Sequence, residues 1–371
     1  MCDIAHSFYS TLYTPEETSV EAQEELLAHV TDKFSVTAAD SLNAELSIDE
    51  IKEALSLMNS NKAPGPDGLS PALYKALADT LLPLMLSAFK AALSMESFPE
   101  ELSLGQIILL YKSGDPTLMK NYRPITLLNS DYKIITKALS RRFSKVLHEV
   151  AGPYQHAFIP GRRAADCTIT LNLVFESLRA QNQPGTILSL DMEKAYDRVH
   201  HEWMFKTLER LGVGNNILQW IKSLYSNAKS SCRVNGFHSQ LIDLKRGVRQ
   251  GDALSCALYI ITLIPFILSI AKSEKIKGIK CKGGICVSVL AYADDTTVLL
   301  DPDADVTELL RIFSVFSRAS NAKINMQKTF SIAVNNAAPL EGGFQNLEEG
   351  ESTVILGYPY STQGLLESQN Y

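Results

Sequence analysis

Paired carboxylates are the residues of this chain whose type and spacing could do chemistry. Asp294 and Asp295 lie inside the apolar segment 287–300, and Asp191 directly follows the apolar segment 186–190. Acids beside buried strands cost desolvation energy unless something compensates, and a divalent cation is a natural compensator. An acid pair at a turn is more often only part of the turn. The pair alone therefore leaves metal binding as the less common alternative.

Asp191 changes that balance because it ends a second apolar strand. If the two strands pair side by side, Asp191 and Asp294 meet at one end of the sheet and can share two cations. Phosphoryl transfer by two metals uses ions about 3.5–4 Å apart to activate the attacking oxygen and to stabilise the leaving one. The pattern therefore favours phosphoryl-transfer chemistry.

Three longer motifs carry a resemblance to a known family. YADD at 292–295 resembles the metal-binding box of reverse transcriptases, and DMEKAYD at 191–197 and RGVRQGD at 246–252 resemble two further boxes of the LINE-type, non-LTR retrotransposon enzymes. Other matches follow in the family's order over about 50–360: NKAPGPDG at 61–68, Lys112 with NYRPI at 121–125, QHAFIPGRR at 155–163, INMQKT at 324–329 and VILGY at 354–358.

The resemblance implies a set of catalytic residues. Asp191 and Asp294 are expected to hold two Mg²⁺ ions, with Mn²⁺ as an alternative, and Asp295 to support them. Lys328 is implied as the proton donor to the pyrophosphate leaving group. Taken without the family, a lysine such as Lys328 is more often a solvated surface residue.

A second set is implied for substrate binding. Lys112 and Arg123 are expected to bind the incoming triphosphate as charged donors, and Gln250 and Gly251 to line the nascent base pair. Tyr196, five residues after Asp191, is expected to lie beneath the sugar. The alternatives are core packing for Tyr196 and a solvated surface position for Lys112.

The fold class expected from the order of elements is α+β. The resemblance implies the fingers and palm of a right-hand polymerase, the palm being a ferredoxin-like antiparallel sheet with helices on one face and the thumb absent or incomplete. The expected boundaries are an acidic N-terminal segment at 1–46, fingers with an N-terminal extension at 47–185, palm at 186–360 and a tail at 361–371.

Periodicity and turn residues locate the elements. A capping-box pattern at 47–50 starts a helix, and Asn235-Gly236 predicts a hairpin turn within 231–248. Further helices are expected within 16–46, over 71–95, 130–148 and 165–180, from Glu193 onward, around 203–211 and 217–224, and over 303–320; strands are expected over 105–111, 186–190 and, as a pair, 287–300.

The segment 253–271 holds nineteen residues without a charge and is followed by five lysines. Its length and flanks suit a membrane span, whereas Pro265 and several hydroxyl residues dilute its hydrophobicity. It also lies between two polar motifs that must meet in one site, so a buried core helix is the favoured interpretation.

Charge is unevenly distributed along the chain. The net charge is −6 overall, but it is −10 over residues 1–50, +9 over 51–300 and −5 over 301–371. The basic middle could face a polyanion, although charge alone favours an ordinary solvated surface. Six cysteines without a CxxC pair and the lack of a secretory pattern at the start predict an intracellular protein of the nucleus or cytoplasm.

The function expected is an RNA-directed DNA polymerase acting on an RNA template, a DNA primer and dNTPs, without a membrane. The alternative is a catalytically idle, nucleic-acid-binding remnant, because the resemblance does not extend to the family's endonuclease, thumb and cysteine-rich segments. An RNA-copying RNA polymerase is disfavoured, since such enzymes usually place an acid near the sugar where this chain has Tyr196.

Overall fold

The computed structural model describes residues 1–95 and 98–366, which divide into two compact units. Each unit is built from segments that are distant in sequence. Unit 1 comprises Met1–Glu16, Asp32–Glu149 and Tyr196–Ile261, and unit 2 comprises Glu17–Thr31, Val150–Ala195 and Thr262–Tyr371. The end of the expected tail, 367–371, lies outside the described residues.

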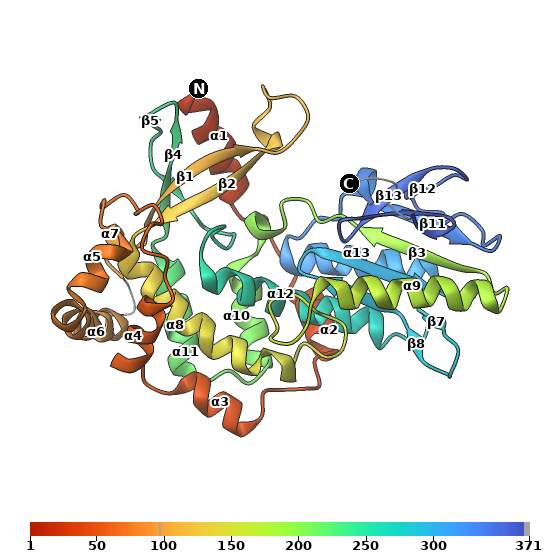
Figure 1. Ribbon diagram of the computed structural model, residues 1–371, viewed down its shortest axis with the longest axis horizontal. Coiled ribbons are helices and arrows are strands. Elements are labelled where there is room, and N and C mark those ends of the chain that lie inside the picture. The colour runs from red at the N-terminus through yellow and green to blue at the C-terminus, as the bar shows by residue number, and fades with distance from the viewer. Residues whose placement is uncertain (96–97, 367–371) are drawn as a thin grey trace. The chain divides into compact units, whose positions relative to one another are not determined.

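Unit 1 combines helices with a five-stranded mixed sheet (Figure 1). The strand order is β2-β1-β4-β5, with β6 also paired to β4; β1 and β2 are antiparallel, whereas β1 and β4 are parallel. Its elements are α1 (Cys2–Tyr13), α3 (Val36–Asn43), α4 (Ile48–Ser56), α5 (Pro71–Ala76), α6 (Ala78–Ser94), α7 (Glu100–Ser103), β1 (Leu104–Tyr111), η1 (Met119–Asn121), β2 (Tyr122–Leu128), α8 (Ser130–Val146), η2 (Leu147–Glu149), α10 (His201–Arg210), α11 (Asn215–Ser226), β4 (Lys229–Val234), β5 (Phe237–His238) and β6 (Ile242–Asp243).

The helix α1 had no counterpart among the expected elements. Its buried residues Ala5, Tyr9 and Leu12 form a core with Ile107 of β1 and Ile242 of β6. Two buried arginines bind the end of this helix and the residues after it. Arg246 donates to the carbonyl of Leu12 at 2.7 Å, and Arg198 forms an ion pair with Glu16 at 2.7 Å. Residues 1–16 are therefore an integral part of unit 1.

Two local features of unit 1, a helix cap and a hairpin turn, were predicted correctly from neighbouring residues. The Ser47 hydroxyl and the Glu50 carboxylate form the expected capping box at the start of α4. Asn235 and Gly236 both have positive φ, 51° and 88°, and join β4 to β5 as a tight hairpin.

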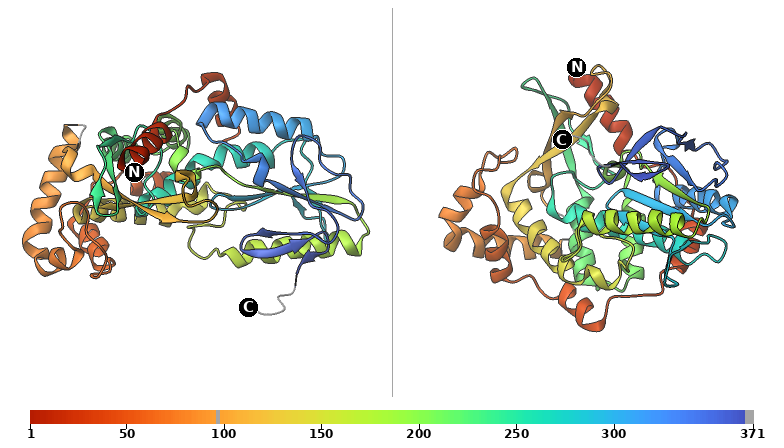
Figure 2. Two further views of the ribbon diagram at one scale, coloured as in Figure 1. Left: turned by 90° about the horizontal axis from the view of Figure 1, so that it is seen from above. Right: turned by 45° about the vertical axis from the view of Figure 1, so that its right-hand side comes forward.

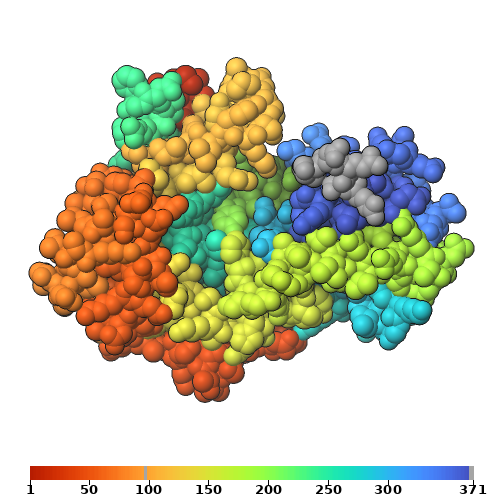
Figure 3. Space-filling model, viewed as in Figure 1, coloured from red at the N-terminus to blue at the C-terminus, as the bar shows by residue number. Residues whose placement is uncertain are grey.

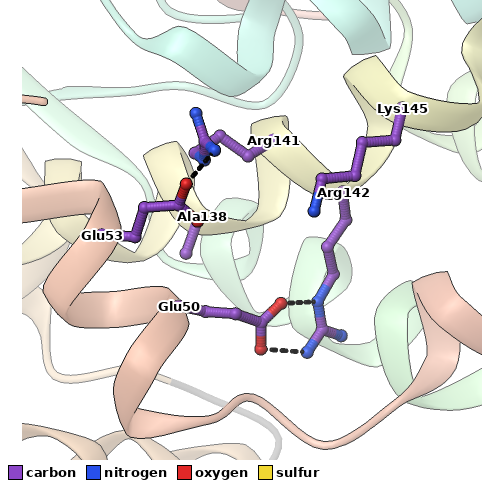
Figure 4. Close-up of a pocket in the computed structure, with 6 residues that line it drawn as sticks. All are labelled: Glu50, Glu53, Ala138, Arg141, Arg142 and Lys145. Atoms are coloured by element: carbon purple, nitrogen blue, oxygen red, sulfur yellow. Dashed lines mark hydrogen bonds and ion pairs between the residues drawn. The ribbon is translucent and has the colours of Figure 1, made fainter.

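Arg142 on α8 holds the N-terminal helices of unit 1 together. Its guanidinium makes two hydrogen bonds to the carboxylate of Glu50, at 2.6 and 2.7 Å (Figure 4). It also donates to the carbonyls of Leu42, Ala44 and Glu45, which follow the last turn of α3 or lie within it. The neighbouring pair, Arg141 with Glu53, is more exposed. In this cluster each arginine is already paired with a glutamate, so the two ion pairs serve the structure of unit 1.

Unit 2 is organised around a second five-stranded sheet with the order β12-β11-β3-β10-β9. The central pairs, β11–β3, β3–β10 and β10–β9, are all antiparallel, and only β12 adds to β11 in parallel. The elements are α2 (Val20–Ala28), α9 (Ala164–Ala180), β3 (Gly185–Leu190), β7 (Ile279–Lys280), β8 (Cys286–Val287), β9 (Val289–Tyr292), β10 (Asp295–Leu300), α13 (Val306–Ser320), η4 (Met326–Lys328), β11 (Phe330–Val334), β12 (Gln345–Asn346), β13 (Ser352–Ile355), β14 (Tyr358–Ser361) and β15 (Gly364–Leu365).

Both faces of this second sheet are covered, so the expectation of helices on one face is wrong. Ile187 and Leu299 share a core with residues of α9, while their neighbours Leu188 and Val298 point to the other face and are equally buried. Figure 2 shows α9 and α13 on opposite sides of the strands. The antiparallel central strands and the mixed α and β content are as expected.

The helix expected from Glu193 onward is also wrong. The backbone amide of Glu193 donates to the carbonyl of Lys323, and Met192 forms an antiparallel bridge with Ile324. These bonds keep the chain extended past β3, and Lys194 then adopts a left-handed φ of 50°. Only a short 3₁₀ turn follows, η3 (Ala195–Arg198), because the extended backbone at Met192 and Glu193 and the left-handed Lys194 are incompatible with the first turns of an α-helix.

The long apolar segment forms α12 (Ala253–Ala271). It is the one described helix long and apolar enough to cross a membrane, and nearly all of it is buried within the protein. Burial of this kind is typical of a core helix, as the sequence predicted.

Candidate active site

The antiparallel pairing of β3 with β10 brings the carboxylates of unit 2 to one end of the sheet. Leu190 lies opposite Thr296, so the same register continued by one residue places Asp191 opposite Asp295. The sequence-based prediction that the two strands lie side by side is therefore confirmed.

Asp294 lies in a two-residue turn at this end of the sheet. Tyr292 pairs with Asp295 across the hairpin, which leaves Ala293 and Asp294 as the turn. Ala293 has a φ of 56°, a left-handed conformation that residues with a Cβ adopt at some cost. Asp294 and Asp191 are half-buried, whereas Asp295 is exposed. The two adjacent acids therefore differ in setting: Asp294 lies in the turn, whereas Asp295 begins β10.

The donor chemistry of these residues fits a magnesium ion, although the side chains do not form a closed site. Among the described residues, no group of three or more His, Cys, Asp or Glu side chains is gathered into a ready-made metal site. Mg²⁺ is usually held by one or two carboxylates, with water and substrate phosphates completing its six ligands. Two carboxylates at one sheet end match that partial donor set.

Lys328 follows a segment that is tied to Asp191. The amide of Asn325 donates to the carbonyl of Asp191 at 2.8 Å, and the amide of Asp191 donates to the hydroxyl of Thr329 at 3.3 Å. Lys328 lies between these two contacts at the end of η4 and is exposed.

Lys112 and Arg123 are brought together by the β1–β2 hairpin of unit 1. Leu110 is opposite Arg123, and the Lys112 amide donates to the carbonyl of Asn121. The two cationic residues are therefore diagonal neighbours on one face of the hairpin, about 7–8 Å apart at their backbones. Both are exposed, and the hairpin lies at the surface in the space-filling view (Figure 3).

Gln250 and Gly251 pack against strand β2 of this hairpin. The amide of Thr126 donates to the Gln250 carbonyl at 2.7 Å. Gly251 has a φ of 112°, and a Cβ there would lie 2.9 Å from the Thr126 carbonyl oxygen. The close approach that requires glycine is thus to the protein's own strand β2, a reason that the sequence did not reveal.

Asp197, to which the sequence reading gave no role, holds the Gln250 side chain. The Gln250 amide nitrogen donates to both carboxylate oxygens of Asp197, each at 3.1 Å. The Tyr13 hydroxyl donates to the same carboxylate at 3.3 Å, and Asp197 is only 1% exposed. Asp197 is the last residue of the DMEKAYD motif at 191–197, and this position was the signal that the sequence offered. The contribution of Tyr13 had no signal, because it is 184 residues distant in sequence.

Burial raises the pKa values of Tyr13 and of Asp252, which follows Gln250 by two residues. Burial, and then the charge of Asp197, raise the pKa of Tyr13 well above its usual range, so the phenol remains a donor. Burial likewise raises the pKa of Asp252 to about 6, although the Thr136 hydroxyl and the Arg249 charge act in the opposite direction.

Tyr196 lies in the turn that is bonded to the Gln250 loop. Its carbonyl accepts from the amide of Val248 at 2.8 Å, and its ring stacks on Tyr259 with centroids 4.6 Å apart. The ring is half-buried. It therefore has both a packing partner and an accessible part.

The sequence profile of the reverse transcriptase (RNA-dependent DNA polymerase) family matches residues 110–359, about two thirds of the chain. The chain belongs to the reverse transcriptase family. It is 33% identical over its whole length to the transposon TX1 uncharacterized 149 kDa protein of Xenopus laevis, covering 28% of that protein. It is also 26% identical to the RNA-directed DNA polymerase from mobile element jockey of Drosophila funebris, over 86% of this chain and 36% of the relative.

The match to non-LTR elements is repeated in a third relative. The Pol polyprotein from the type-1 retrotransposable element R2 of Popillia japonica is 29% identical over 73% of this chain and 37% of its own length. The chain is thus a reverse transcriptase domain of the non-LTR type, as its motifs predicted. It spans about a third of the length of the curated relatives that it matches.

The Asp197 network generates a prediction for the reverse transcriptase domain. Asp197→Asn replaces one acceptor oxygen with a donor that faces either Gln250 or Tyr13, so a buried donor is left unsatisfied. We expect a loss of about 1–3 kcal/mol in the free energy of unfolding and a lower catalytic efficiency. Urea unfolding and primer-extension kinetics check both effects. The control is Asp243→Asn, an exposed acid on β6, and a loss equal to the control's would contradict the assigned role.

Proposed function

We propose that this chain catalyses RNA-directed DNA synthesis, adding dNTPs to the 3′-hydroxyl of a DNA primer on an RNA template. The observation that carries the proposal is the register of β3 and β10, which brings Asp191 to the same sheet end as the Asp294 turn. Family membership supports the reaction class.

In this proposal Asp191 and Asp294 hold two Mg²⁺ ions, with Asp295 supporting them and Mn²⁺ as an alternative. When bound, such a pair of ions lowers the pKa of the attacking hydroxyl and stabilises the charge on the leaving oxygen. Lys328 supplies a proton to the departing pyrophosphate.

The residues of unit 1 are assigned to the substrates. Lys112 and Arg123 bind the triphosphate, since two neighbouring cations on one hairpin face match its adjacent negative charges. Gln250, held from behind by Asp197, presents its remaining amide oxygen beside the nascent base pair. Tyr196 lies beneath the sugar.

The finer architecture belongs to the same proposal. We assign fingers with an N-terminal extension to 47–185 and palm to 186–360, with template RNA and primer DNA as nucleic-acid partners. An enzyme with this task acts inside the cell, in the nucleus or cytoplasm.

The direct test is primer extension on homopolymeric RNA with Mg²⁺, comparing the chain with Asp294→Asn. We expect weak, distributive synthesis by the parent and a loss of about a thousandfold or more in the mutant, since one metal carboxylate contributes several kcal/mol to the transition state. Asp303→Asn, an exposed acid after β10, is the matched control. Equal signals from the parent and Asp294→Asn would leave the catalytically idle, nucleic-acid-binding remnant.

The triphosphate assignment predicts a KM effect. Lys112→Ala and Arg123→Ala should each raise the apparent KM for dNTP and leave template affinity nearly unchanged, because they remove charges from the nucleotide rather than from the duplex. Lys222→Ala, on α11 and paired with Glu209, controls for loss of a positive charge. A flatter salt dependence of template binding in either mutant would instead assign that residue to the nucleic-acid backbone.

The position of Tyr196 predicts sugar selection. A ribonucleotide would have to displace the ring or bury an unpaired 2′-hydroxyl, a penalty of roughly 1–3 kcal/mol. Tyr196→Ala should therefore raise ribonucleotide use relative to deoxyribonucleotide use at least about tenfold, whereas Tyr196→Phe should retain the parent preference. Steady-state incorporation ratios and the thermal midpoint are measured together. An unchanged ratio in a soluble, active Tyr196→Ala protein would remove Tyr196 from the active site and leave it a packing role, as in its stacking on Tyr259.

A further inference from the structure

The hairpin formed by β9 and β10 carries Asp294 in its turn. Its outer edge is covered by the loop that leads into α9. β9 is an edge strand of its sheet, and residues 154–156 pair with it as a short parallel extension. The Ala291 amide donates to the Tyr154 carbonyl, and the His156 amide donates to the Ala291 carbonyl, both at 2.8 Å. This loop carries the QHAFIPGRR motif, to which the proposed chemistry assigns no role.

The side chain of Gln155 clamps the backbone of the turn. Its Oε1 accepts from the amide of Ala293 at 2.9 Å, and its Nε2 donates to the carbonyl of Ala293 at 3.3 Å. Both polar backbone groups of one turn residue are thereby satisfied by one side chain. Gln155 is completely buried, so these bonds are shielded from competition with water.

Gln155 is itself held in place before it reaches the turn. Its Oε1 also accepts from the amide of Ala157 at 3.0 Å. The Arg162 guanidinium donates to the Gln155 carbonyl at 2.6 Å and to the Gly152 carbonyl at 2.5 Å. Contacts within its own loop therefore orient the Gln155 side-chain amide independently of the turn.

The clamped residue is the one that directly precedes Asp294 and has the left-handed φ of 56°. A residue with a Cβ leaves that conformation readily unless its surroundings hold it. Here two hydrogen bonds with the buried Gln155 amide hold it, in addition to the pairing of Tyr292 with Asp295 on either side of the turn. Release of Ala293 would let the turn change type and would redirect the Asp294 carboxylate.

We propose that Gln155 is a positioning residue for Asp294: it locks the Ala293 turn so that the carboxylate is presented to the metal before the metal binds. The proposal rests on the proposed function for its catalytic consequence, but the lock itself is a property of the chain alone. Because Gln155 is fully buried and its side chain is bonded to the protein's own backbone, it acts through Asp294 and is not a catalytic residue.

The test compares Gln155→Met, which keeps the volume and removes the three hydrogen bonds, with the matched control Asn335→Gly. Asn335 also bridges backbone with a part-buried side-chain amide, donating to the carbonyls of Leu178 and Gln183 at 2.8 and 2.9 Å. It follows β11 at the opposite end of the same sheet, because Val334 pairs with Gly185 at the start of β3. Glycine tolerates its φ of 51°, so the control removes a bridging side-chain amide without straining the turn that carries it.

Hydrogen exchange on the full chain without substrate is the first measurement. In Gln155→Met the Ala293 amide should exchange at least about tenfold faster, the equivalent of one or two ordinary hydrogen bonds, and the control should leave it unchanged. Mn²⁺ binding followed by electron paramagnetic resonance should need a higher ion concentration in Gln155→Met only. Neither measurement depends on polymerase activity, so failure of the proposed function would leave both interpretable.

Kinetics supply the second measurement. kcat should fall about a hundredfold in Gln155→Met, the usual effect of misplacing a reacting group by about 1 Å, while the dNTP KM stays within about twofold. If Gln155→Met does not fold, Gln155→Glu takes its place: it retains both accepted hydrogen bonds and should keep the Ala293 amide protected. Parent-like exchange at Ala293 in folded Gln155→Met, or lost protection in folded Gln155→Glu, would overturn the proposal.

Discussion

The antiparallel pairing of β3 with β10 is the interaction on which the catalytic account depends. It determines where Asp191 leaves the sheet and which residues of the next hairpin it meets. A slip of β3 by one residue would turn Leu188 to the other face of the sheet and would move Asp191 away from Asp295, and the packed side chains on both faces oppose it. The hydrophobic core of unit 2 is thus what aligns its acids.

Carboxylates at the end of a buried sheet cost desolvation free energy, which a bound cation can offset. The left-handed Ala293, the buried Gln155 amide and the buried Asp197 carboxylate are each expensive by the rules of local structure. Each is compensated by specific hydrogen bonds rather than by packing. Their concentration next to the predicted metal and base-pair residues is typical of sites where preorganisation serves chemistry.

Sequence reasoning found the elements and motifs whose signals are local, and it missed what depends on distant backbone contacts. The capping box at Ser47, the Asn235-Gly236 turn and the paired strands around Asp294 could be read from neighbouring residues. The helix expected at Glu193 could not be corrected from sequence, because its amide is taken by Lys323. Likewise, neither the α1 helix with Tyr13 nor the reason for Gly251 has a local signature, since both depend on segments that are distant in sequence.

The most direct test of the central claim is the number of Mn²⁺ ions bound by the chain with template, primer terminated at its 3′ end, and dNTP, counted by electron paramagnetic resonance. The account predicts two ions for the parent and a loss of tight binding in both Asp191→Asn and Asp294→Asn, since the carboxylates at the end of β3 and in the β9–β10 turn act as one site. Unchanged binding of two ions in either mutant would contradict it.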